Sequence, residues 1–318
     1  KKYKEAVAVA VEACAADTKG QTCYICTQAL HWKTKEGLVR MCACRGTAGF
    51  AHVSCLAEQA KILYAEAEEN NLDGERWSSR WARWYSCSLC EQEYHGAVEC
   101  ALGWACWKTY LGRPETDGVL QCAMTLLGNG LFAARYYPDA LSVQEAEMSM
   151  LRRLGAHEED LLVVQANLAT TYEFLGRSEE ALGMRQDVYS GNVRLEGEES
   201  HEALQAANNY ASTLSRLERH EEAKSLLRKM IPVARRVLGE SNDITLRVRL
   251  NCARALYMNT GATLDDLREA VTTLEDLERT ARRVFGGEHP FTGELEDSLR
   301  EVRAALRARE GDVEPLRA

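Results

Sequence analysis

The sequence predicts a small zinc-binding module near the start of the chain, followed by an all-α solenoid of helical repeats. Two observations carry this prediction. Seven cysteines and one histidine in the first third stand at metal-ligand spacing, and leucine, asparagine, alanine and glycine recur every 42 residues farther on. The 318 residues are 46% hydrophobic with five prolines, so the chain has enough apolar side chains to fold as two domains.

The metal ligands come in short pairs. In chain order they are Cys23, Cys26, Cys42, Cys44, His52, Cys55, Cys87 and Cys90. A C-x2-C or C-x-C pair lets two thiolates from one tight turn reach the same ion at about 2.3 Å each, as tetrahedral zinc requires. Eight ligands fill two such sites and leave no position for a substrate or water. The zinc is therefore expected to be structural.

The order of the ligand types, with seven residues between Cys44 and His52, resembles the RING-CH (RING-variant) finger. Residues 42–56 also read like the central stretch of that family. The resemblance implies a small α+β cross-brace with two structural zinc ions. The first zinc would be held by Cys23, Cys26, His52 and Cys55, and the second by Cys42, Cys44, Cys87 and Cys90.

Alternative roles fit the cysteines less well. The plant homeodomain finger uses the same ligand types, but it usually has fewer residues before its histidine. A disulfide framework needs an oxidising compartment and is usual in short secreted chains. Five more cysteines lack a partner at ligand spacing and are expected to be buried apolar residues. They are Cys14, Cys100, Cys106, Cys122 and Cys252. For two of them, Cys100 and Cys106, a role as spare metal ligands is the less favoured alternative.

The 42-residue repeat is visible in several columns of the sequence. Its members include Leu162, Leu204 and Leu246, then Asn167, Asn209 and Asn251, then Ala169, Ala211 and Ala253. Each unit holds two helical stretches, such as 160–175 and 179–195, separated by a glycine turn. This is a helix–turn–helix repeat of the tetratricopeptide (TPR) kind. The period and the turn segments 174–181 and 286–292 resemble the TPRs of kinesin light chain.

The ends of the solenoid are expected to differ from its middle. Residues 117–154 fit the register as a degenerate repeat, with Gly128 and Gly130 breaking its first helix because each costs about 1 kcal/mol against alanine. Residues 291–309 are expected to form a polar capping helix. The predicted domains are a helical or linker segment (1–18), the finger (19–97), an aromatic-rich joint (98–117) and the repeats (118–318).

The tryptophans around the last cysteine pair have two possible roles. They are Trp77, Trp81, Trp84, Trp104 and Trp107. A hydrophobic joint that seats the finger on the first helices is the favoured interpretation, and a partner-binding surface is the alternative.

The RING-CH resemblance implies a ubiquitin-protein ligase that docks a charged ubiquitin-conjugating enzyme and forms no covalent intermediate. No residue is expected to be catalytic. The docking groove would use Ile25, Leu56, Ile62 and Leu89. The TPR resemblance implies a concave face that binds a peptide or protein substrate. Asn167, Asn209 and Asn251 recur on this face and are expected either to hydrogen-bond the peptide backbone or to form hydrogen bonds between repeats.

Three features depart from the family pattern. Gln59 stands where many members have tryptophan, 31 residues separate Cys55 from Cys87, and Glu91 replaces a basic residue after the last ligand. Gln59 and Glu91 favour a non-catalytic interaction scaffold as the alternative function. A chromatin reader is the third candidate, if the finger is of the plant homeodomain type.

Composition and motifs exclude several classes of function. A net charge of −9 argues against a nucleic-acid partner. No run approaches the 18 apolar residues of a membrane span, so a soluble protein is expected. Phosphate-binding loops and H-E-x-x-H motifs are absent from the sequence. Metal-binding thiols must stay reduced, which indicates the cytosol or nucleus. The sequence begins with Lys1 and not with methionine, so the presence of an upstream targeting segment is left open.

Overall fold

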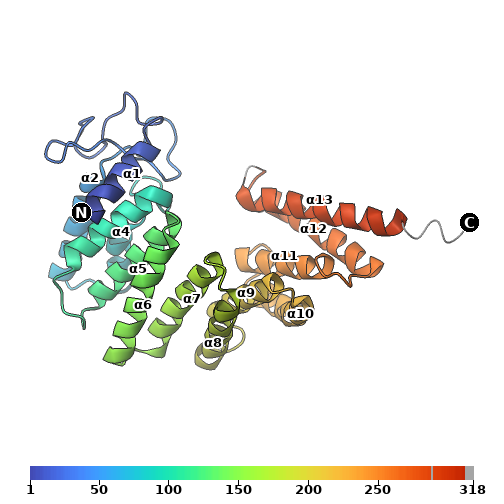
Figure 1. The fold of residues 1–318 in the computed structure, drawn as a ribbon. Coiled ribbons are helices and arrows are strands. Elements are labelled where there is room, and N and C mark those ends of the chain that lie inside the picture. The colour runs from blue at the N-terminus through green and yellow to red at the C-terminus, as the bar shows by residue number, and fades with distance from the viewer. Residues whose placement is uncertain (288, 312–318) are drawn as a thin grey trace, which may run out of the picture. The chain divides into compact units, whose positions relative to one another are not determined.

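The computed structural model describes residues 1–287 and 289–311, and its regular elements are helices. The chain divides into two compact units, the first Lys1–His157 and the second beginning at Glu158. Figure 1 shows the helices in chain order. None of the helices formed by the described residues is long and apolar enough to cross a membrane. Glu288, in the predicted turn 286–292, and residues 312–318 of the predicted repeat domain lie outside the described residues.

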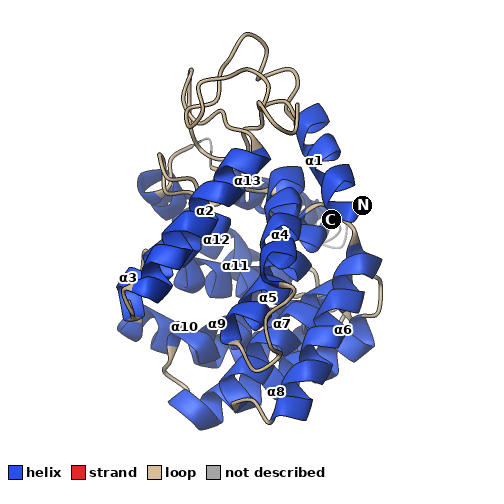
Figure 2. Ribbon diagram, turned by 90° about the vertical axis from the view of Figure 1, so that its left-hand side faces the viewer, coloured by secondary structure: helices blue, strands red, loops and turns tan. Residues whose placement is uncertain are grey.

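The first unit contains six α-helices and one 3-10 helix. They are α1 (Lys2–Ala13), α2 (Val53–Glu69), α3 (Gly74–Trp81), the 3-10 helix η1 (Ala82–Trp84), α4 (Gly96–Tyr110), α5 (Gly118–Ala133) and α6 (Tyr137–Leu154). The finger residues before α2 form loops that gather at one end of α1, α2 and α4 (Figure 2).

The described residues of the second unit form a run of seven helices. They are α7 (Glu158–Phe174), α8 (Ser178–Glu196), α9 (His201–Arg216), α10 (His220–Val237), α11 (Asp243–Tyr257), α12 (Leu264–Val284) and α13 (Pro290–Gly311). The repeated columns of the sequence form its core, where Leu204, Leu246 and Ala211 are fully buried. The unit is an all-helical solenoid. Its last helix, α13, buries Phe291, Leu295 and Val302 on one face, as a capping helix does.

The β component expected for the finger is smaller than predicted. Among the described residues the backbone pairs only as two isolated antiparallel bridges, Val39 with Ala51 and Ser86 with Glu93. Several of the segments between ligands form tight turns closed by their own hydrogen bonds, and the longest one, after Cys55, is mostly helical. Buried Val39, Phe50, Ala51 and Leu102 pack around these loops as a small core.

Trp81 and Trp84 are buried, and the other three tryptophans of the joint are half-buried. The Trp81 ring lies 5.2 Å from Tyr64, 5.8 Å from Tyr110 and 6.5 Å from Trp84, and the Trp84 ring lies 5.8 Å from Tyr110. Trp77 stacks on Trp81 at 5.7 Å. Burial of this cluster between α2, α3, η1 and α4 fits the hydrophobic joint and leaves little area for a partner. Two of the spare cysteines, Cys100 and Cys106, are buried in α4, away from the finger's ligands.

The prediction that Gly128 and Gly130 break the first helix of the degenerate repeat is wrong, because α5 runs through both glycines. A β-carbon at Gly128 would lie 3.2 Å from the Gln144 side chain of α6, whereas Gly130 packs against α4. A β-carbon at Gly130 would lie 2.8 Å from the α-carbon of Cys100, and one at Gly103 would lie 2.7 Å from the Leu126 carbonyl oxygen. The glycines let the two backbones touch, and this contact offsets their low helix propensity.

The α5–α6 pair is built like the later repeats. Arg135, in the turn between α5 and α6, has a left-handed backbone conformation. Gly176 and Glu218 have the same conformation at the equivalent position of two turns in the second unit. In each of the three turns, the N–H of the following residue donates a 2.9 Å hydrogen bond to the backbone carbonyl five residues earlier. The donors are Tyr136, Arg177 and Arg219. These are the hydrogen bonds of a Schellman helix end. Residues 117–154 therefore form a helical pair of the repeat type.

Alanine at Gly130 is expected to destabilise the first unit by about 1 to 3 kcal/mol, because its β-carbon overlaps the α4 backbone. Gly183 on α8 is the matched control, since a β-carbon there meets nothing within 4 Å. Gly183→Ala should stabilise the second unit by up to about 1 kcal/mol. Urea unfolding followed by hydrogen exchange measures both. Equal effects of the two substitutions would contradict the close α4–α5 contact.

A buried carboxyl lies between α5 and α6. The Glu147 side chain is 1% exposed, one of its oxygens accepts a hydrogen bond from the Thr125 hydroxyl, and the other has no partner among the residues that the structure describes. Burial raises the pKa of Glu147 to about 7, against an opposing effect of the Thr125 hydrogen bond. The unfolded chain releases this proton near pH 4.5, whereas the folded unit keeps it. Glu147 therefore costs stability increasingly as the pH rises from about 4.5 to about 7.

Glu147→Gln should remove this pH-dependent cost. At pH 8 the variant is expected to be more stable than the parent by up to about 3 kcal/mol, and the gain should shrink as the pH falls toward 5. Paired urea titrations at pH 5, 6.5 and 8 measure the difference. Because variant and parent are compared at the same pH, the contributions of the other titrating groups to the free energy of unfolding cancel. A gain that does not depend on pH would show that Glu147 does not carry the shifted proton.

Candidate metal centre

The structure brings the eight predicted ligands together in two groups. One contains Cys23, Cys26, His52 and Cys55, and the other contains Cys42, Cys44, Cys87 and Cys90. Within each group the potential ligand atoms all lie within 4.8 Å of one another. The groups alternate along the chain, since each combines two pairs separated by a pair of the other group.

The interatomic distances fit a tetrahedral zinc ion. Two sulfurs bound to one zinc stand about 3.8 Å apart, and a sulfur and a nitrogen about 3.6 Å. In the second group the sulfurs of Cys44 and Cys87 are 3.7 Å apart. In the first group the His52 Nδ1 lies 3.4 Å from the Cys26 sulfur and 3.6 Å from the Cys55 sulfur. Both groups thus have the chemistry and the spread of a zinc site.

The two C-x2-C pairs share one backbone conformation. In each, the first cysteine's sulfur accepts a hydrogen bond from the N–H two residues on, Ile25 to Cys23 at 3.4 Å and Leu89 to Cys87 at 3.5 Å. The residue after each second cysteine, Thr27 or Glu91, is in the left-handed region. The two turns contact each other through a 3.0 Å hydrogen bond between the side-chain hydroxyls of Tyr24 and Ser88. We call them the twin knuckles.

His52 is oriented by its second ring nitrogen. Its Nδ1 faces the cysteines, and its Nε2 lies 3.4 Å from the Ala29 carbonyl oxygen. A metal-bound histidine usually donates its other N–H to such an acceptor, which fixes the ring. Burial lowers the pKa of His52, which favours the neutral imidazole that a metal requires.

Burial raises the pKa of several thiols in the groups. The pKa of Cys44 rises to about 11, and those of Cys42 and Cys55 rise further. Burial acts in the same direction on Cys90, but hydrogen bonds, first of all from the Gln92 backbone, bring its pKa down to about 7. Sulfurs so close together do not all ionise without a cation between them. Metal binding therefore displaces protons, and acid opposes it.

The predicted docking residues divide into exposed and buried members. Ile25 and Leu89, at the same position of the twin knuckles, are exposed, and so is Ile62 on α2. Leu56 was predicted to join them, but this is wrong, because its side chain is only 3% exposed and packs in the finger core. Its place on α2 faces inward, and Leu63 lies on the exposed groove instead.

Trp32 is the main surface residue that the sequence did not reveal. Its side chain is 68% exposed and lines a groove of about 410 Å³ with Ile25, Ile62 and Leu63. The loop that carries it has neither a helical period nor a ligand, so no pattern marked it. Gln59, at the position where many family members have tryptophan, lines the same groove.

The turn that presents Trp32 copies the knuckle conformation without metal ligands. The His31 N–H bonds the Glu36 carbonyl at 3.0 Å, the Lys35 N–H bonds the His31 carbonyl at 2.9 Å, and Lys35 is in the left-handed region. The Glu36 carboxylate accepts hydrogen bonds from the Ser54 N–H and hydroxyl at 2.7 and 2.9 Å. These bonds fix the turn to the start of α2.

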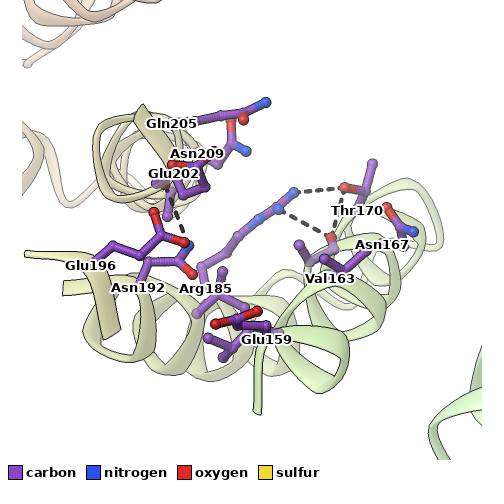
Figure 3. A pocket seen from close by; sticks show the side chains of 14 residues that line it. Glu159, Val163, Asn167, Thr170, Arg185, Asn192, Glu196, Glu202, Gln205 and Asn209 are labelled. Carbon is purple, nitrogen blue, oxygen red and sulfur yellow. Dashed lines mark hydrogen bonds between the residues drawn. The ribbon is translucent and has the colours of Figure 1, made fainter. Parts of the chain in front are cut away.

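The second unit has a polar pocket of about 470 Å³ between α7, α8 and α9 (Figure 3). Two of the predicted groove asparagines, Asn167 and Asn209, line it. Asn251 does not, because its Nδ2 donates to Asn208 Oδ1 at 2.8 Å and so joins two repeats. Arg185 is buried beside the pocket, paired with Glu173 at 3.3 Å.

Comparison with protein families gives two separate matches. Residues 23–71 match the RING-variant domain, and residues 202–260 match the tetratricopeptide repeat. The last knuckle, with Cys87 and Cys90, lies beyond the matched part of the finger, although its sulfurs complete the second group. A search among curated proteins gave no match.

Solved structures resemble the chain in fold. BtubC (BKLC) from P. vanneervenii is 14% identical, with 83% of this chain and 87% of that chain covered and a TM-score of 0.51. A putative kinesin light chain protein of nearly identical TPR-like repeats from Podosopora anserina is 16% identical, with 73% and 97% covered and a TM-score of 0.50. The apo form of RapI is 14% identical, with 80% and 69% covered and a TM-score of 0.53.

At these identities the likenesses establish only the fold, a TPR-like helical solenoid. The family matches add the domain types. The chain thus contains a RING-variant domain at residues 23–71 and a tetratricopeptide repeat at residues 202–260, and its helices share the fold of the kinesin-light-chain TPR-like repeats.

Proposed function

We propose that this protein is a RING-type ubiquitin-protein ligase. The finger docks a ubiquitin-conjugating enzyme, and the repeats recruit the substrate. The observation that carries the proposal is the surface at the twin knuckles, where Ile25, Leu89, Ile62 and Trp32 are all exposed. Exposed apolar side chains gathered in this way mark a protein-binding site.

Two structural zinc ions hold the finger as a cross-brace in this proposal. Cys23, Cys26, His52 and Cys55 bind one ion, and Cys42, Cys44, Cys87 and Cys90 bind the other. The alternating groups and their tetrahedral distances support this assignment. Every ligand position is taken by a side chain, so the ions fix the backbone and bind no substrate.

The docking surface comprises Ile25, Trp32, Ile62, Leu63 and Leu89. The first four line one groove, and Leu89 stands on the knuckle bonded to the one that carries Ile25. The surface is held from both sides, by the metal groups under the knuckles and by the Glu36–Ser54 bonds under the Trp32 turn. Such preorganisation lets a partner bind without ordering loops first.

The finger promotes transfer by positioning. The conjugating enzyme carries ubiquitin as a thioester. An amine of the substrate attacks the thioester carbonyl, so that an amide bond forms, the C–S bond breaks and the cysteine thiol of the conjugating enzyme leaves. Holding the two reactants in attack geometry accelerates such a step without a nucleophile of the ligase itself. This agrees with a finger whose thiols are occupied as ligands.

The departures from the family pattern have structural counterparts. The long gap after Cys55 is filled by α2, α3 and η1, which carry the buried tryptophans. Gln59 lies in a groove that already contains Trp32. Glu91 closes its knuckle in the left-handed region. Gln59 and Glu91 still favour a second candidate, a non-catalytic scaffold that uses the same surface.

The repeats are proposed to bind an extended segment of the substrate in the pocket of Asn167 and Asn209. Side-chain amides there can bond a peptide backbone, whereas Asn251 is engaged between repeats. The proposed domain limits are 19–97 for the finger, 98–117 for the joint and 118 onward for the repeats. A cytosolic or nuclear compartment suits thiols that must stay reduced.

The purified chain is expected to contain two zinc ions by mass spectrometry, and Cys44→Ser should reduce this to about one. Removing zinc should unfold the finger, because structural zinc contributes about 10 to 16 kcal/mol in small domains. Hydrogen exchange of 19–97 should rise after chelation, whereas 158–287 should stay protected. Unchanged protection of the finger in metal-free protein would refute the structural zinc.

Autoubiquitination with a panel of conjugating enzymes tests the ligase. Ile25→Ala and Trp32→Ala should each lower the rate at least about tenfold, as the loss of a central interface contact does. Leu111→Ala is the matched control. Leu111 is also exposed on the first unit, but it lines neither the docking groove nor the pocket of the second unit.

Cys42→Ser should abolish the activity by disrupting the second metal group. Activity that survives Ile25→Ala and Trp32→Ala would contradict docking on this surface. Absence of activity with every enzyme, from protein that contains two zinc ions, would leave the scaffold as the function.

A further inference from the structure

A second pocket of the first unit shares Trp32 with the docking groove. It has a volume of about 860 Å³ and lies between α1, the Trp32 turn, α2 and α4. We propose that this basic pocket binds an acidic segment of a protein partner. The pocket adjoins the docking groove and shares His31, Trp32, Ser54 and Glu58 with it, but its lysines lie outside that groove, so the proposal does not depend on ligase activity.

The charge of the pocket is opposite to that of the chain. Lys33, Lys61 and Lys108 line it, and its single carboxylate is that of Glu58. Glu58 lies 3.6 Å from Lys61 in an exposed pair, which is a weak interaction. Among the described residues, Lys33 and Lys108 have no carboxylate within 4.0 Å. In a protein of net charge −9, this excess of positive charge is available to an anionic ligand.

Aromatic side chains hold and flank these cations. The Lys108 ammonium lies 5.0 Å from the centroid of the Tyr3 ring, and the Tyr3 hydroxyl lies 3.5 Å from the Ser54 hydroxyl. Trp32 and His31 form another wall, on the turn fixed by Glu36. The pocket therefore offers ammonium groups for carboxylates beside rings for aliphatic parts. A segment that mixes aspartate or glutamate with leucine has both features.

The same observations favour a protein ligand over a nucleic acid. Nucleic-acid sites follow the phosphate backbone with an extended row of lysine and arginine. Here arginine is missing from the lining, and Glu58 lies among the lysines. An oligonucleotide is accordingly an outcome to be tested against the acidic peptide.

Fluorescence anisotropy on the full chain tests the proposal. The probe is a fluorescein-labelled ten-residue peptide of aspartate and glutamate with two leucines, compared with its asparagine and glutamine counterpart. The acidic peptide should bind, and its affinity should fall as sodium chloride rises from 50 to 300 mM. Lys33→Glu with Lys108→Glu should weaken binding at least about tenfold. Trp32→Ala should weaken it about threefold or more.

Lys19→Glu with Lys229→Glu is the matched control, because it changes the net charge equally at exposed lysines outside the pocket. It should alter the affinity less than about twofold if the pocket, and not overall charge, binds the peptide. Equal loss in both double variants, equal binding of the neutral peptide, or tighter binding of a ten-nucleotide oligothymidine would overturn the proposal. Because the assay contains no ubiquitin or conjugating enzyme, its failure leaves the ligase proposal standing.

Discussion

The finger depends on one constraint, the convergence of four side chains from distant segments on each of two points. Its backbone pairs only as two isolated bridges among the described residues, and the loops otherwise rest on their own turns and on the core cluster around Val39 and Phe50. The cysteine and histidine groups join residues 23–26 to 52–55 and residues 42–44 to 87–90. The twin knuckles follow from this geometry, and they set Ile25 and Leu89 on the surface. A metal ion in each group would therefore fix both the loops of the finger and its proposed docking surface.

The finger is part of a larger unit. Its last ligand pair is followed directly by α4, which contacts the buried tryptophans on one side and α5 on the other. Gly103 and Gly130 allow the α4 and α5 backbones to touch, which ties the first repeat-like pair to the finger. This explains why the compact unit extends to His157 and includes the finger, the joint and the α5–α6 pair. The neighbouring helices support the geometry of the finger.

Local spacing predicted much of this structure, and tertiary packing decided the rest. Ligand pairs and the 42-residue period are short-range patterns, so the pairs and the helical repeats could be read from the sequence, whereas the division of the pairs into two groups was implied by the RING-CH resemblance. The burial of Leu56 and the role of Gly130 depend on which residues pack against them in the fold. The role of Asn251 likewise depends on its hydrogen bond to Asn208 of the preceding repeat. Trp32 lies in an irregular loop, where only the fold reveals exposure.

The central claim is that two zinc ions are held by seven cysteines and one histidine. X-ray absorption at the zinc edge tests it most directly on the purified chain. Seven sulfurs and one nitrogen shared by two ions give an average of 3.5 sulfurs and 0.5 nitrogen per zinc. The predicted spectrum has a main shell at about 2.3 Å with that composition. An average of fewer than three sulfurs, or a dominant oxygen shell near 2.0 Å, would contradict the account.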